Sequence, residues 1–324
     1  MDIIDKYKLG NIIGKGSISL LYNTFENDKV VKKICNREDY DIINEELETS
    51  IINKLRIVNN IDKYILLPQN IEYYNEYIIF TYKKAIYNLY DYFKKKNRKI
   101  IEMNYLEILY IIVYAVDILH NNRIVHCDLK LENILIFNDK DDYYNVNICD
   151  FNLSLYENMV IDNQLCTVTT RPPEWHFIKK VDYINRKSDV FSLGIIVIEV
   201  LFIKGYWYHI DFIKEYKHKY NLTWEEIYLR SIPNSLYTDR KIEWSNYIKD
   251  PIKKIQILTN TEEFPNGWLK DYIIENCIYI NKEITERILK YVDNMISVKI
   301  IERPNCNQIL KYLSIIKNDI KISE

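Results

Sequence analysis

Hydrophobic and polar positions near the start of the chain alternate with a period of about two, which is typical of β-strands. One apolar run covers Tyr7–Ile13 and ends at a glycine turn, a second covers Leu20–Phe25, and a third covers Lys29–Ile34. Two further runs, Ile65–Glu72 and Tyr77–Tyr82, have the same character. We therefore expect a β-rich N-terminal part.

The spacing of apolar positions changes to a helical period in three longer stretches. Isoleucines and leucines recur on one face over 39–58, and Asn104–His120 has a strong amphipathic pattern. Arg186–Phe202 is almost entirely apolar, which predicts a helix buried on all sides. Two short apolar runs between the last two helices, Ile134–Phe137 and Val146–Cys149, predict strands.

This order of elements predicts an α+β fold with two lobes, a small β-rich N-lobe with one main helix and a larger, mainly helical C-lobe. The change of pattern places the boundary near Tyr82–Ala85. We predict one domain over 1–316, with lobes at 1–83 and 84–316, followed by a C-terminal tail at 317–324.

Composition narrows the functional classes. The 324 residues are 48% hydrophobic and 28% charged with a net charge of −2, so the chain lacks the basic field that favours nucleic acid or membrane surfaces. Six cysteines form no C-x-x-C pair, so neither a zinc site nor a disulfide framework is predicted. No apolar run resembles a signal peptide or reaches the roughly 20 residues that span a bilayer. We expect a soluble cytoplasmic monomer, with nuclear entry left open and no nucleic-acid or membrane partner.

A glycine-containing turn links the first two predicted strands. Gly14 and Gly16 flank Lys15, and Ser19 stands where a third glycine would complete the pattern G-x-G-x-x-G. These glycines could simply serve a tight hairpin. The alternative is a loop whose backbone approaches phosphate oxygens, which the small side chain of Ser19 still permits.

The third predicted strand carries two adjacent lysines, one of which could reach phosphates in a cleft. Strand alternation places Lys32 on the same face as Val30 and Ile34. We therefore predict that Lys32 points inward and keep Lys33 as the alternative.

A glutamate on the following helix would hold the inward ammonium group by an ion pair. The spacing from the apolar face of that helix favours Glu48, with Glu45 and Glu46 as competitors.

The most specific pattern is the run H-C-D-L-K-L-E-N at residues 126–133, which matches H-x-D-L-K-x-x-N and precedes an apolar strand. With this run the chain resembles the eukaryotic-type protein kinases, from Tyr7 to about Ile315. The resemblance implies that Asp128 is the catalytic base, that Lys130 lies beside the transferring phosphoryl group, and that Asn133 holds a magnesium ion.

A second run, Asp150-Phe151-Asn152, resembles the D-F-G motif of the same family. Asp150 would then bind the Mg²⁺ that bridges the phosphates of ATP. Asn152 replaces the glycine, and because asparagine tolerates positive φ better than most residues, we expect it to make the turn.

The resemblance also implies ATP and Mg²⁺ as cofactors. Phe80 would guard the back of the adenine pocket, and the backbone of a hinge at Thr81–Lys83 would bond to adenine. The implied nucleotide-binding residues are Ile13, Gly14, Lys15, Gly16, Ser17, Ser19, Leu21, Lys32, Glu48, Phe80, Thr81 and Lys83.

Two further motifs resemble structural parts of the family. Arg171-Pro172-Pro173-Glu174 is similar to the A-P-E motif, in which Glu174 would pair with Arg303. Asp189, in the run K-S-D-V-F-S-L-G, would hold the backbone of the catalytic loop.

Details within these motifs resemble the serine/threonine kinases, which phosphorylate Ser and Thr hydroxyls of protein substrates. Lys130 fits that class, as does Thr167, which would contact the catalytic aspartate. Arg171 and the H-C-D-L-K loop are most similar to the CMGC group, in particular its dual-specificity tyrosine-regulated (DYRK) and Cdc-like kinases. The abundance of Ile, Asn, Lys and Tyr is typical of an AT-rich genome, such as that of a large DNA virus.

Three departures from the family pattern, Ser19, Cys127 and Asn152, support the alternative of a pseudokinase that binds partners without turnover. Cys127 replaces an arginine that in many kinases binds a phosphate on the activation loop, and Asp162 lies where related kinases often carry a phosphorylated threonine. We therefore expect the loop to be active without phosphorylation.

Overall fold

The computed structural model describes residues 3–16, 19–25, 30–36, 42–95, 105–137, 145–160, 166–176, 184–202, 211–237, 240–245, 264–276 and 281–323. The chain forms two compact units. Met1–Leu89 and Glu132–Ser154 make up the first, and Tyr90–Leu131 and Leu155–Glu324 make up the second. The lobe boundary at residue 83 stays a prediction, but the first unit also contains a later segment that the sequence pattern does not reveal.

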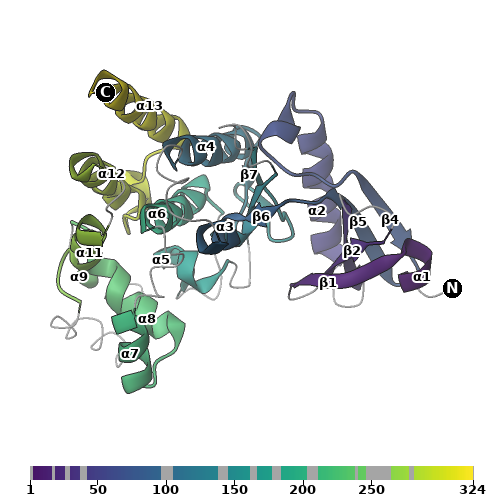
Figure 1. The fold of residues 1–324 in the computed structure, drawn as a ribbon, viewed down its shortest axis with the longest axis horizontal. Coiled ribbons are helices and arrows are strands. Elements are labelled where there is room, and N and C mark those ends of the chain that lie inside the picture. Colours follow the sequence, from purple (N-terminus) through teal and green to yellow (C-terminus); the bar gives the residue numbers. More distant parts are fainter. Residues whose placement is uncertain are drawn as a thin grey trace. The chain divides into compact units, whose positions relative to one another are not determined.

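The first unit is built on a five-stranded antiparallel sheet in the order β1-β2-β3-β5-β4 (Figure 1). Its strands are β1 (Leu9–Lys15), β2 (Ser19–Thr24), β3 (Val30–Asn36), β4 (Asn70–Tyr74) and β5 (Tyr77–Lys83). A short helix α1 (Ile3–Tyr7) precedes the sheet, and α2 (Ile42–Arg56) follows β3. The helix predicted over 39–58 is thus shorter at its C-terminal end, and its first residues lie outside the described part.

A second, three-stranded sheet completes this unit. It consists of β6 (Tyr87–Asn88), β8 (Ile134–Ile136) and β9 (Val146–Ile148), in the order β6-β8-β9. The strands predicted from the two short apolar runs after the catalytic loop are therefore present, each slightly shorter than expected.

The predicted strand Ile65–Glu72 is wrong over its first half. Only its end lies in β4, while Ile65 forms an isolated bridge to Ile148 and Leu66 donates its N–H to the Ile148 carbonyl at 2.8 Å. Pro68 has no N–H and therefore interrupts a ladder. The apolar run is explained by burial of Ile65 beside β9.

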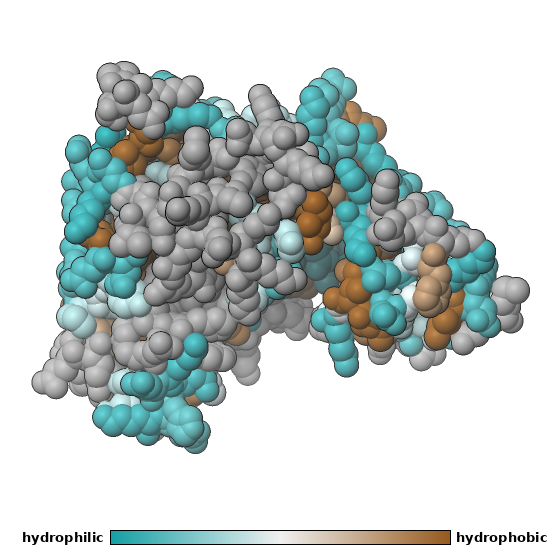
Figure 2. Space-filling model, viewed as in Figure 1, coloured by the Kyte–Doolittle hydropathy of each residue, from teal (hydrophilic) through white to brown (hydrophobic). Residues whose placement is uncertain are grey.

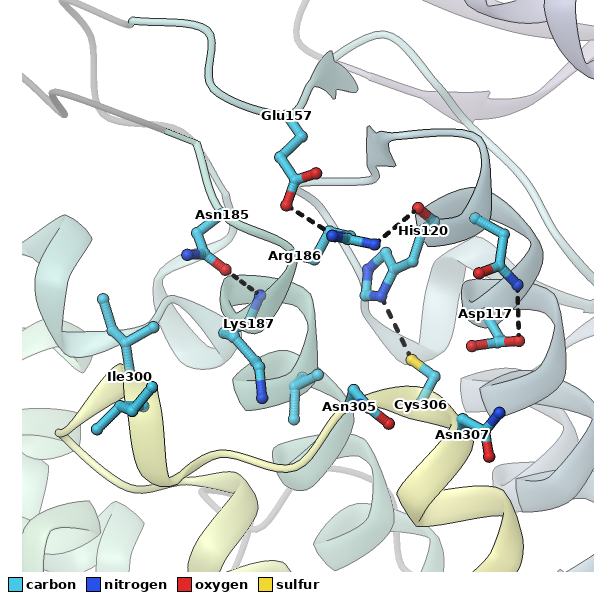
Figure 3. Close-up of a pocket in the computed structure, with 13 residues that line it drawn as sticks. Asp117, His120, Glu157, Asn185, Arg186, Lys187, Ile300, Asn305, Cys306 and Asn307 are labelled. Carbon is cyan, nitrogen blue, oxygen red and sulfur yellow. Dashed lines mark hydrogen bonds and ion pairs between the residues drawn. The ribbon is translucent and has the colours of Figure 1, made fainter.

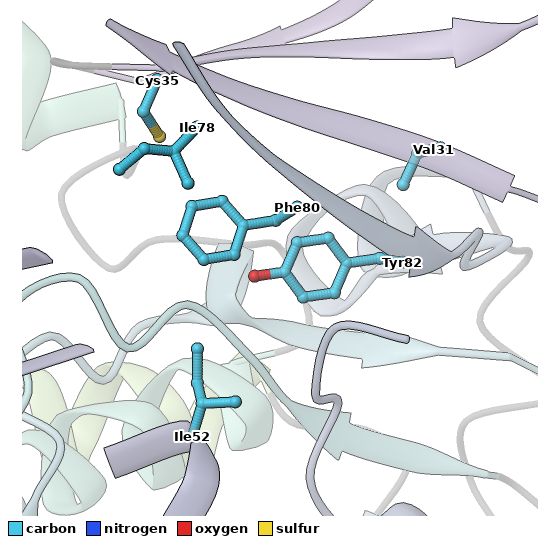
Figure 4. Packing of buried hydrophobic residues seen from close by; sticks show 6 residues of the cluster. All are labelled: Val31, Cys35, Ile52, Ile78, Phe80 and Tyr82. Atoms are coloured by element: carbon cyan, nitrogen blue, oxygen red, sulfur yellow. The ribbon is translucent and has the colours of Figure 1, made fainter. Parts of the chain in front are cut away.

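Both faces of the five-stranded sheet carry hydrophobic side chains. An inner cluster joins β3 and β5 to α2 through Val31, Cys35, Ile52, Ile78, Phe80 and Tyr82 (Figure 4). An outer cluster contains Leu9, Ile34 and Ile79, with Ile3, Tyr7, Tyr22, Tyr74 and Tyr77 packed against it. Because both faces are apolar, strand alternation alone does not distinguish inward from outward residues.

The second unit is mainly helical (Figure 1). Its long helices are α4 (Tyr105–Asn121), α6 (Arg186–Phe202), α12 (Lys282–Met295) and α13 (Cys306–Ser323). Helix α4 contacts α6 and α13, and α12 contacts α6. The predicted helices Asn104–His120 and Arg186–Phe202 are confirmed within one residue. The predicted tail at 317–324 is largely helical instead, because α13 continues to Ser323.

The remaining elements are short. The other helices are α3 (Leu89–Lys95), α5 (Pro173–His176), α7 (Asp211–Lys219), α8 (Trp224–Ser231), α9 (Lys241–Ser245) and α11 (Trp268–Asn276). The 3₁₀ helices are η1 (Ile61–Lys63), η3 (Leu131–Asn133), η4 (Val168–Thr170), η6 (Ile232–Asn234) and η7 (Ile300–Glu302). A two-stranded pair joins β7 (Ile124–Val125) to β10 (Leu155–Tyr156).

Aromatic side chains fill the interior of the second unit. Trp244 lies 6.2 Å from Phe191 between ring centroids, and Trp268 lies 5.3 Å from Phe264. Both tryptophans are buried, so they serve as packing anchors in the core. The expected α+β class, with a β-rich first part and a helical second part, is confirmed.

Some apolar side chains of the described residues lie at the surface. Figure 2 shows hydrophobic residues interspersed with hydrophilic ones on the visible side, and Phe25, Ile57 and Ile301 are among the most exposed. Scattered exposed apolar residues are normal for globular proteins. Among the described helices, none is both long and apolar enough to cross a membrane.

Candidate active site

Lys33, on β3, is the centre of a charged cluster in the first unit. Its Nζ lies 2.8 Å from Asp150 Oδ1 and 3.7 Å from Glu48 Oε1. Lys33 and Glu48 are buried, while the side chain of Asp150 is 32% exposed. The expected ion pair between Glu48 and a β3 lysine is therefore present, but the lysine is Lys33.

The prediction that Lys32 points inward is wrong. Lys32 Nζ donates to Thr81 Oγ1 at 2.9 Å and lies 3.8 Å from Glu72 Oε2, on the outer face of the sheet. It also lies 5.0 Å from the centroid of the Tyr7 ring. The alternation was assigned to the wrong face because Ile34 packs into the outer cluster, which the sequence did not reveal.

The carboxylates around Lys33 favour its charged form. Burial opposes the charged form, but the neighbouring Asp150 and Glu48 outweigh it and raise the pKa of Lys33 well above its ordinary value. A raised lysine pKa means that the pair stabilises the fold at every pH below the ordinary lysine pKa and loses that effect only above it. Lys33 is therefore a permanent cation at neutral pH.

Phe80 and Tyr82 lie on the face of β5 that carries the inner cluster (Figure 4). Phe80 is paired with Lys33 in the ladder, and its ring centroid lies 5.6 Å from Lys33 Nζ. Tyr82 stacks on Phe80 at 6.4 Å and is paired with Val31. Burial raises the pKa of Tyr82, and Lys33 is a charged neighbour of its hydroxyl. The period of two along β5 was the signal that could have identified Tyr82 together with Phe80.

The expected hinge at Thr81–Lys83 lies within the sheet. The Thr81 carbonyl accepts a hydrogen bond from the Gln69 N–H at 2.7 Å, and Lys83 is still paired with Val30. A carbonyl oxygen has two lone pairs, so this bond leaves room for another, and the hydrogen bonds expected between the backbone of Thr81–Lys83 and adenine stay a prediction. Lys83 ends β5 and remains a predicted adenine neighbour.

The glycine turn joins β1 to β2. The Gly16 N–H donates to the Ser19 carbonyl at 2.8 Å, and a Cβ on Gly16 would lie 3.0 Å from Ser19 Oγ. The backbone therefore closes tightly here, and Ser17 lies outside the described residues. Of the other implied nucleotide-binding residues, Ile13, Gly14 and Lys15 lie at the end of β1, and Leu21 packs against the inner cluster.

Asp150 itself adopts the backbone conformation that was expected of Asn152. Its φ is 69°, whereas Asn152 is not among the described residues with positive φ. Aspartate shares with asparagine a short polar side chain that tolerates this region. The prediction for Asn152 is thus wrong by two residues, and the turn instead aims the Asp150 carboxylate at Lys33.

Asn133 and Asp150 offer the oxygen atoms that a magnesium ion needs. The Cys149 N–H donates to the Asn133 carbonyl at 3.0 Å, which holds the two segments together. Carboxylate and amide oxygens fit Mg²⁺, which usually takes its other ligands from phosphates and water. Among the described residues, no cluster of three or more His, Cys, Asp or Glu side chains forms a metal site by itself.

Asp128 lies in a second charged cluster, inside the second unit. Lys130 Nζ donates to Asp128 Oδ2 at 2.6 Å, and Thr167 Oγ1 donates to Asp128 Oδ1 at 2.8 Å. Lys130 also reaches Thr167 Oγ1 at 3.1 Å. The contact expected between Thr167 and the Asp128–Lys130 pair is therefore present, and the buried Asp128 carboxylate is held on both oxygens.

Asp189 supports the backbone just before Asp128. Its Oδ2 accepts the N–H of His126 at 2.8 Å and its Oδ1 accepts the N–H of Cys127 at 3.0 Å. Cys127 has a φ of 66°, which is unfavourable for a residue with a Cβ. The two bonds hold this conformation, as the sequence predicted for Asp189.

Glu174 and Arg303 form the predicted buried pair. Both carboxylate oxygens accept from the guanidinium group, each at 2.7 Å. The geometry is bidentate, which is the strongest form of such a pair. Ser188 Oγ also donates to Glu174 at 3.2 Å, a contact that no sequence pattern singled out.

These arrangements coincide with a known family. The protein kinase domain matches residues 7–313 of the chain. The fold has the two parts of that family, a β-sheet N-lobe and a helical C-lobe, and the motif residues occupy the places described above. The chain belongs to the protein kinase family.

Known kinases share moderate identity with part of the chain. The carbon catabolite-derepressing protein kinase of Saccharomyces cerevisiae is 29% identical over 208 residues, 61% of this chain and 31% of the relative. A putative dual specificity tyrosine-phosphorylation-regulated kinase 3 homolog of Drosophila melanogaster is 28% identical over 60% of this chain and 24% of its own length. A putative serine/threonine-protein kinase/receptor of Acanthamoeba polyphaga mimivirus is 31% identical over 65% of this chain and 13% of its own length. The chain thus spans less than a third of each of these relatives.

A solved structure supports the fold. A chain in the crystal structure of the yeast RNA Pol II CTD kinase CTDK-1 complex matches with a TM-score of 0.61 and 17% identity, covering 93% of this chain and 90% of that one. At this identity the similarity shows the fold alone.

Proposed function

We propose that this protein is an active serine/threonine protein kinase that transfers the γ-phosphoryl group of ATP to hydroxyl groups of protein substrates. The observation that carries the proposal is the geometry at Asp128, whose two oxygens are held by Lys130 at 2.6 Å and Thr167 at 2.8 Å. A fixed, buried carboxylate can orient a substrate hydroxyl and accept its proton.

Lys130 has a separate part in the proposed reaction. Its ammonium group is bound to Asp128 and to Thr167 Oγ1, so it is held at the place where the attacking oxygen would lie. A cation there stabilises negative charge that develops on the transferring phosphoryl group.

The first unit supplies the proposed nucleotide contacts. Lys33 is a permanent cation beside Asp150 and Glu48, which suits it to bind phosphate oxygens. Asn133 and Asp150 would hold Mg²⁺. When bound, the ion neutralises charge on the phosphates of ATP. Glu48 would keep Lys33 in place when Asp150 turns to the metal.

The serine/threonine class rests on Lys130 and Thr167, and on the similarity to the putative serine/threonine-protein kinase/receptor of mimivirus. Membership in the CMGC group and a viral origin are further proposals. The first is supported by Arg171, whose Nη2 donates to the Cys166 carbonyl at 2.8 Å, and by the Drosophila relative. The second is supported by the mimivirus relative and by the composition.

A second candidate is a pseudokinase. The observation that favours it is the direct contact of Lys33 Nζ with Asp150 Oδ1 at 2.8 Å, because it occupies one oxygen of the proposed metal ligand. Asn152, which replaces the glycine of the D-F-G motif, also favours the pseudokinase.

Transfer of labelled phosphate from ATP to a general protein substrate, with Mg²⁺, tests the proposal. We expect incorporation into serine and threonine that disappears in Asp128→Asn. Binding of ATP in a thermal-shift assay without any transfer by the wild-type protein would favour the pseudokinase. Absence of both ATP binding and transfer in a folded wild-type protein would contradict the active kinase and leave a pseudokinase that does not use the nucleotide.

A further inference from the structure

His120, at the end of α4, lies between a carboxylate and a thiol. Its Nε2 is 3.0 Å from Asp189 Oδ2, on α6, and its Nδ1 is 3.4 Å from Cys306 Sγ, on α13 (Figure 3). The imidazole is 5% exposed. Three helices therefore meet at one buried ring, and the sequence analysis singled out only Asp189 among these residues.

The Asp189 carboxylate determines the protonation of His120 Nε2, the nitrogen that faces it. It is fully buried and already accepts the N–H groups of His126 and Cys127. A carboxylate only accepts hydrogen bonds, so the nitrogen that faces it must carry a proton. His120 Nε2–H is thus a third donor to Asp189.

The Cys306 thiol determines the hydrogen bond at the other nitrogen of the ring, His120 Nδ1. Burial raises the pKa of Cys306 well above its ordinary value, and Asp117 raises it further, so the sulfur keeps its proton at neutral pH. A thiol is a weak donor, and a neutral imidazole with Nε2–H has its acceptor at Nδ1. The Cys306 S–H and the His120 Nδ1 lone pair are therefore complementary.

Cys306 is placed by the turn that precedes it. The Asn305 side chain accepts the Gln308 N–H at 2.9 Å, and the Gln308 side chain accepts the Asn305 N–H at 2.8 Å. This reciprocal cap fixes the first turn of α13. The Arg303–Glu174 pair anchors the chain just before it.

We propose that Cys306 is a positioning residue, whose thiol holds His120 in the Nε2–H form that Asp189 needs to fix the backbone beside Asp128. The effect passes through two hydrogen bonds to the catalytic loop and involves no contact of Cys306 with substrate. The expected effect of Cys306 on catalysis rests on the proposed kinase function. The expected protonation state of His120 does not depend on that function.

The surroundings show what the thiol prevents. His120 and Cys306 both line a polar cavity of about 680 Å³ whose wall includes Asp117, Arg186 and Lys187. Without the thiol, Nδ1 would face this cavity and could take a second proton from water. The charged or titratable groups around His120 are Asp189, Cys306, His126, Asp117, Glu157, Arg186 and Lys187. An imidazolium there would draw the Asp189 carboxylate toward the ring and away from the two backbone N–H groups.

Nitrogen NMR of the ring tests the inference on the full chain. The protein has five histidines, so ¹⁵N signals of His120 can be assigned by their loss in His120→Gln. In the wild type at neutral pH we expect a protonated Nε2, which faces Asp189, and an unprotonated Nδ1, which faces the thiol. In Cys306→Ala we expect the Nδ1 signal to move toward that of a protonated nitrogen, and in Cys306→Ser we expect the hydroxyl to restore the wild-type signals. Cys35→Ala, a buried cysteine of the other unit, should leave them unchanged.

Two results would overturn the inference. One is a wild-type His120 that carries a proton on Nδ1 at neutral pH, which needs no variant to fold. The other is an unchanged ring in a folded Cys306→Ala protein.

Kinetics test the catalytic consequence separately. We expect Cys306→Ala to lower kcat by about tenfold, on the scale of one lost hydrogen bond to a charged group, with little change in KM for ATP and recovery in Cys306→Ser. A loss in KM alone, or no recovery in Cys306→Ser, would contradict the positioning role. If the wild type shows no transfer, the proposed function fails while the NMR result still decides the state of His120.

Discussion

Lys32 and Lys33 are adjacent on β3, yet their ammonium groups lie beside carboxylates on opposite faces of the same sheet. Lys33 Nζ lies 2.8 Å from Asp150 Oδ1, whereas Lys32 Nζ lies 3.8 Å from Glu72 Oε2. The two residues therefore form a matched pair of variants, of equal chemistry and neighbouring position, in which only one belongs to the proposed active site.

Lys33→Met should lower kcat/KM for ATP by roughly 10²–10³, the usual loss when one preorganised electrostatic contact is removed. Lys32→Met should change it much less, because among the described residues this side chain contacts Thr81, Glu72 and Tyr7 on the outer face. Steady-state kinetics of both variants, with circular dichroism as a check on folding, measure the difference. A larger loss in Lys32→Met would reverse the assignment.

Lys32 and Lys33 also show which parts of the candidate site could be predicted from the sequence alone. Residues fixed by a distinctive local pattern were placed correctly: Asp128 meets Thr167, and Glu174 meets Arg303 over a long stretch of chain. Lys32 was chosen wrongly because alternation reports two faces but not which of them is covered by α2.

Backbone conformation and tertiary burial were the other sources of error. Positive φ falls on Asp150 rather than Asn152, at the residue that pairs with Lys33, and the sequence does not indicate this pair. The strand expected from Ile65 begins at Asn70, because an apolar run can be buried without a ladder. The bond between Cys306 and His120 joins elements with no common motif, so no local pattern could indicate it.

Asp128→Asn should reduce kcat by about 10²–10⁴, the usual contribution of a general base. The amide keeps the size of the side chain but has one acceptor oxygen instead of two, so the contact with either Lys130 or Thr167 is lost together with the base. Asp271→Asn, on the exposed side of α11, is the control and should leave activity unchanged. Near wild-type turnover by a folded Asp128→Asn protein would remove Asp128 from the mechanism.

The Glu174–Arg303 pair should matter for stability. Arg303 is 1% exposed and Glu174 is 7% exposed, so Arg303→Met would leave a buried carboxylate without its cation, at a cost of about 3–5 kcal/mol in the free energy of unfolding. Urea denaturation measures this. The exposed pair Arg287–Asp319, with Nη2 and Oδ2 at 2.6 Å, is the matched control, and its loss should be barely measurable. Similar effects for both pairs would mean that burial is not the cause.

Phe80 should limit the size of nucleotides that the protein accepts, as the sequence predicts. Because Phe80 is 1% exposed inside the inner cluster, Phe80→Gly should also destabilise the first unit, by about 3–5 kcal/mol as for other buried aromatic residues. If it folds, it should admit ATP analogues with bulky N6 groups. Tyr82→Gly, at a buried aromatic residue of the same cluster, is the matched comparison.

Transfer from such analogues, measured for both variants, decides between the two aromatic residues. Use of the analogues by a folded Tyr82→Gly protein and not by a folded Phe80→Gly protein would contradict the assignment of Phe80.

Activity should persist after complete dephosphorylation. Cys127, before the catalytic base, is buried and its pKa is raised by burial and by Asp189, so it offers no charge to a phosphate on the activation loop. Asp162 lies outside the described residues, and its part as a fixed negative charge stays a prediction. Phosphatase treatment, verified by mass spectrometry, should leave kcat within about twofold of the untreated enzyme, since no bidentate phosphate contact is lost. A large loss would point to another residue, such as Tyr156 or Thr169, as the switch.

The discontinuity of the first unit has a consequence for the order of folding. Lys33 and its partner Asp150 belong to the same compact unit, but Tyr90–Leu131, which belongs to the other, separates their segments. A ribosome that adds about 5–20 residues per second would complete the five-stranded sheet roughly 3–13 s before Asp150 is added. During this interval Lys33 has Glu48 beside it but lacks Asp150, so the charge of its ammonium group in the nascent sheet is incompletely compensated. The growing chain should therefore be easiest to proteolyse in this window, and it should become resistant only when β8 and β9 emerge.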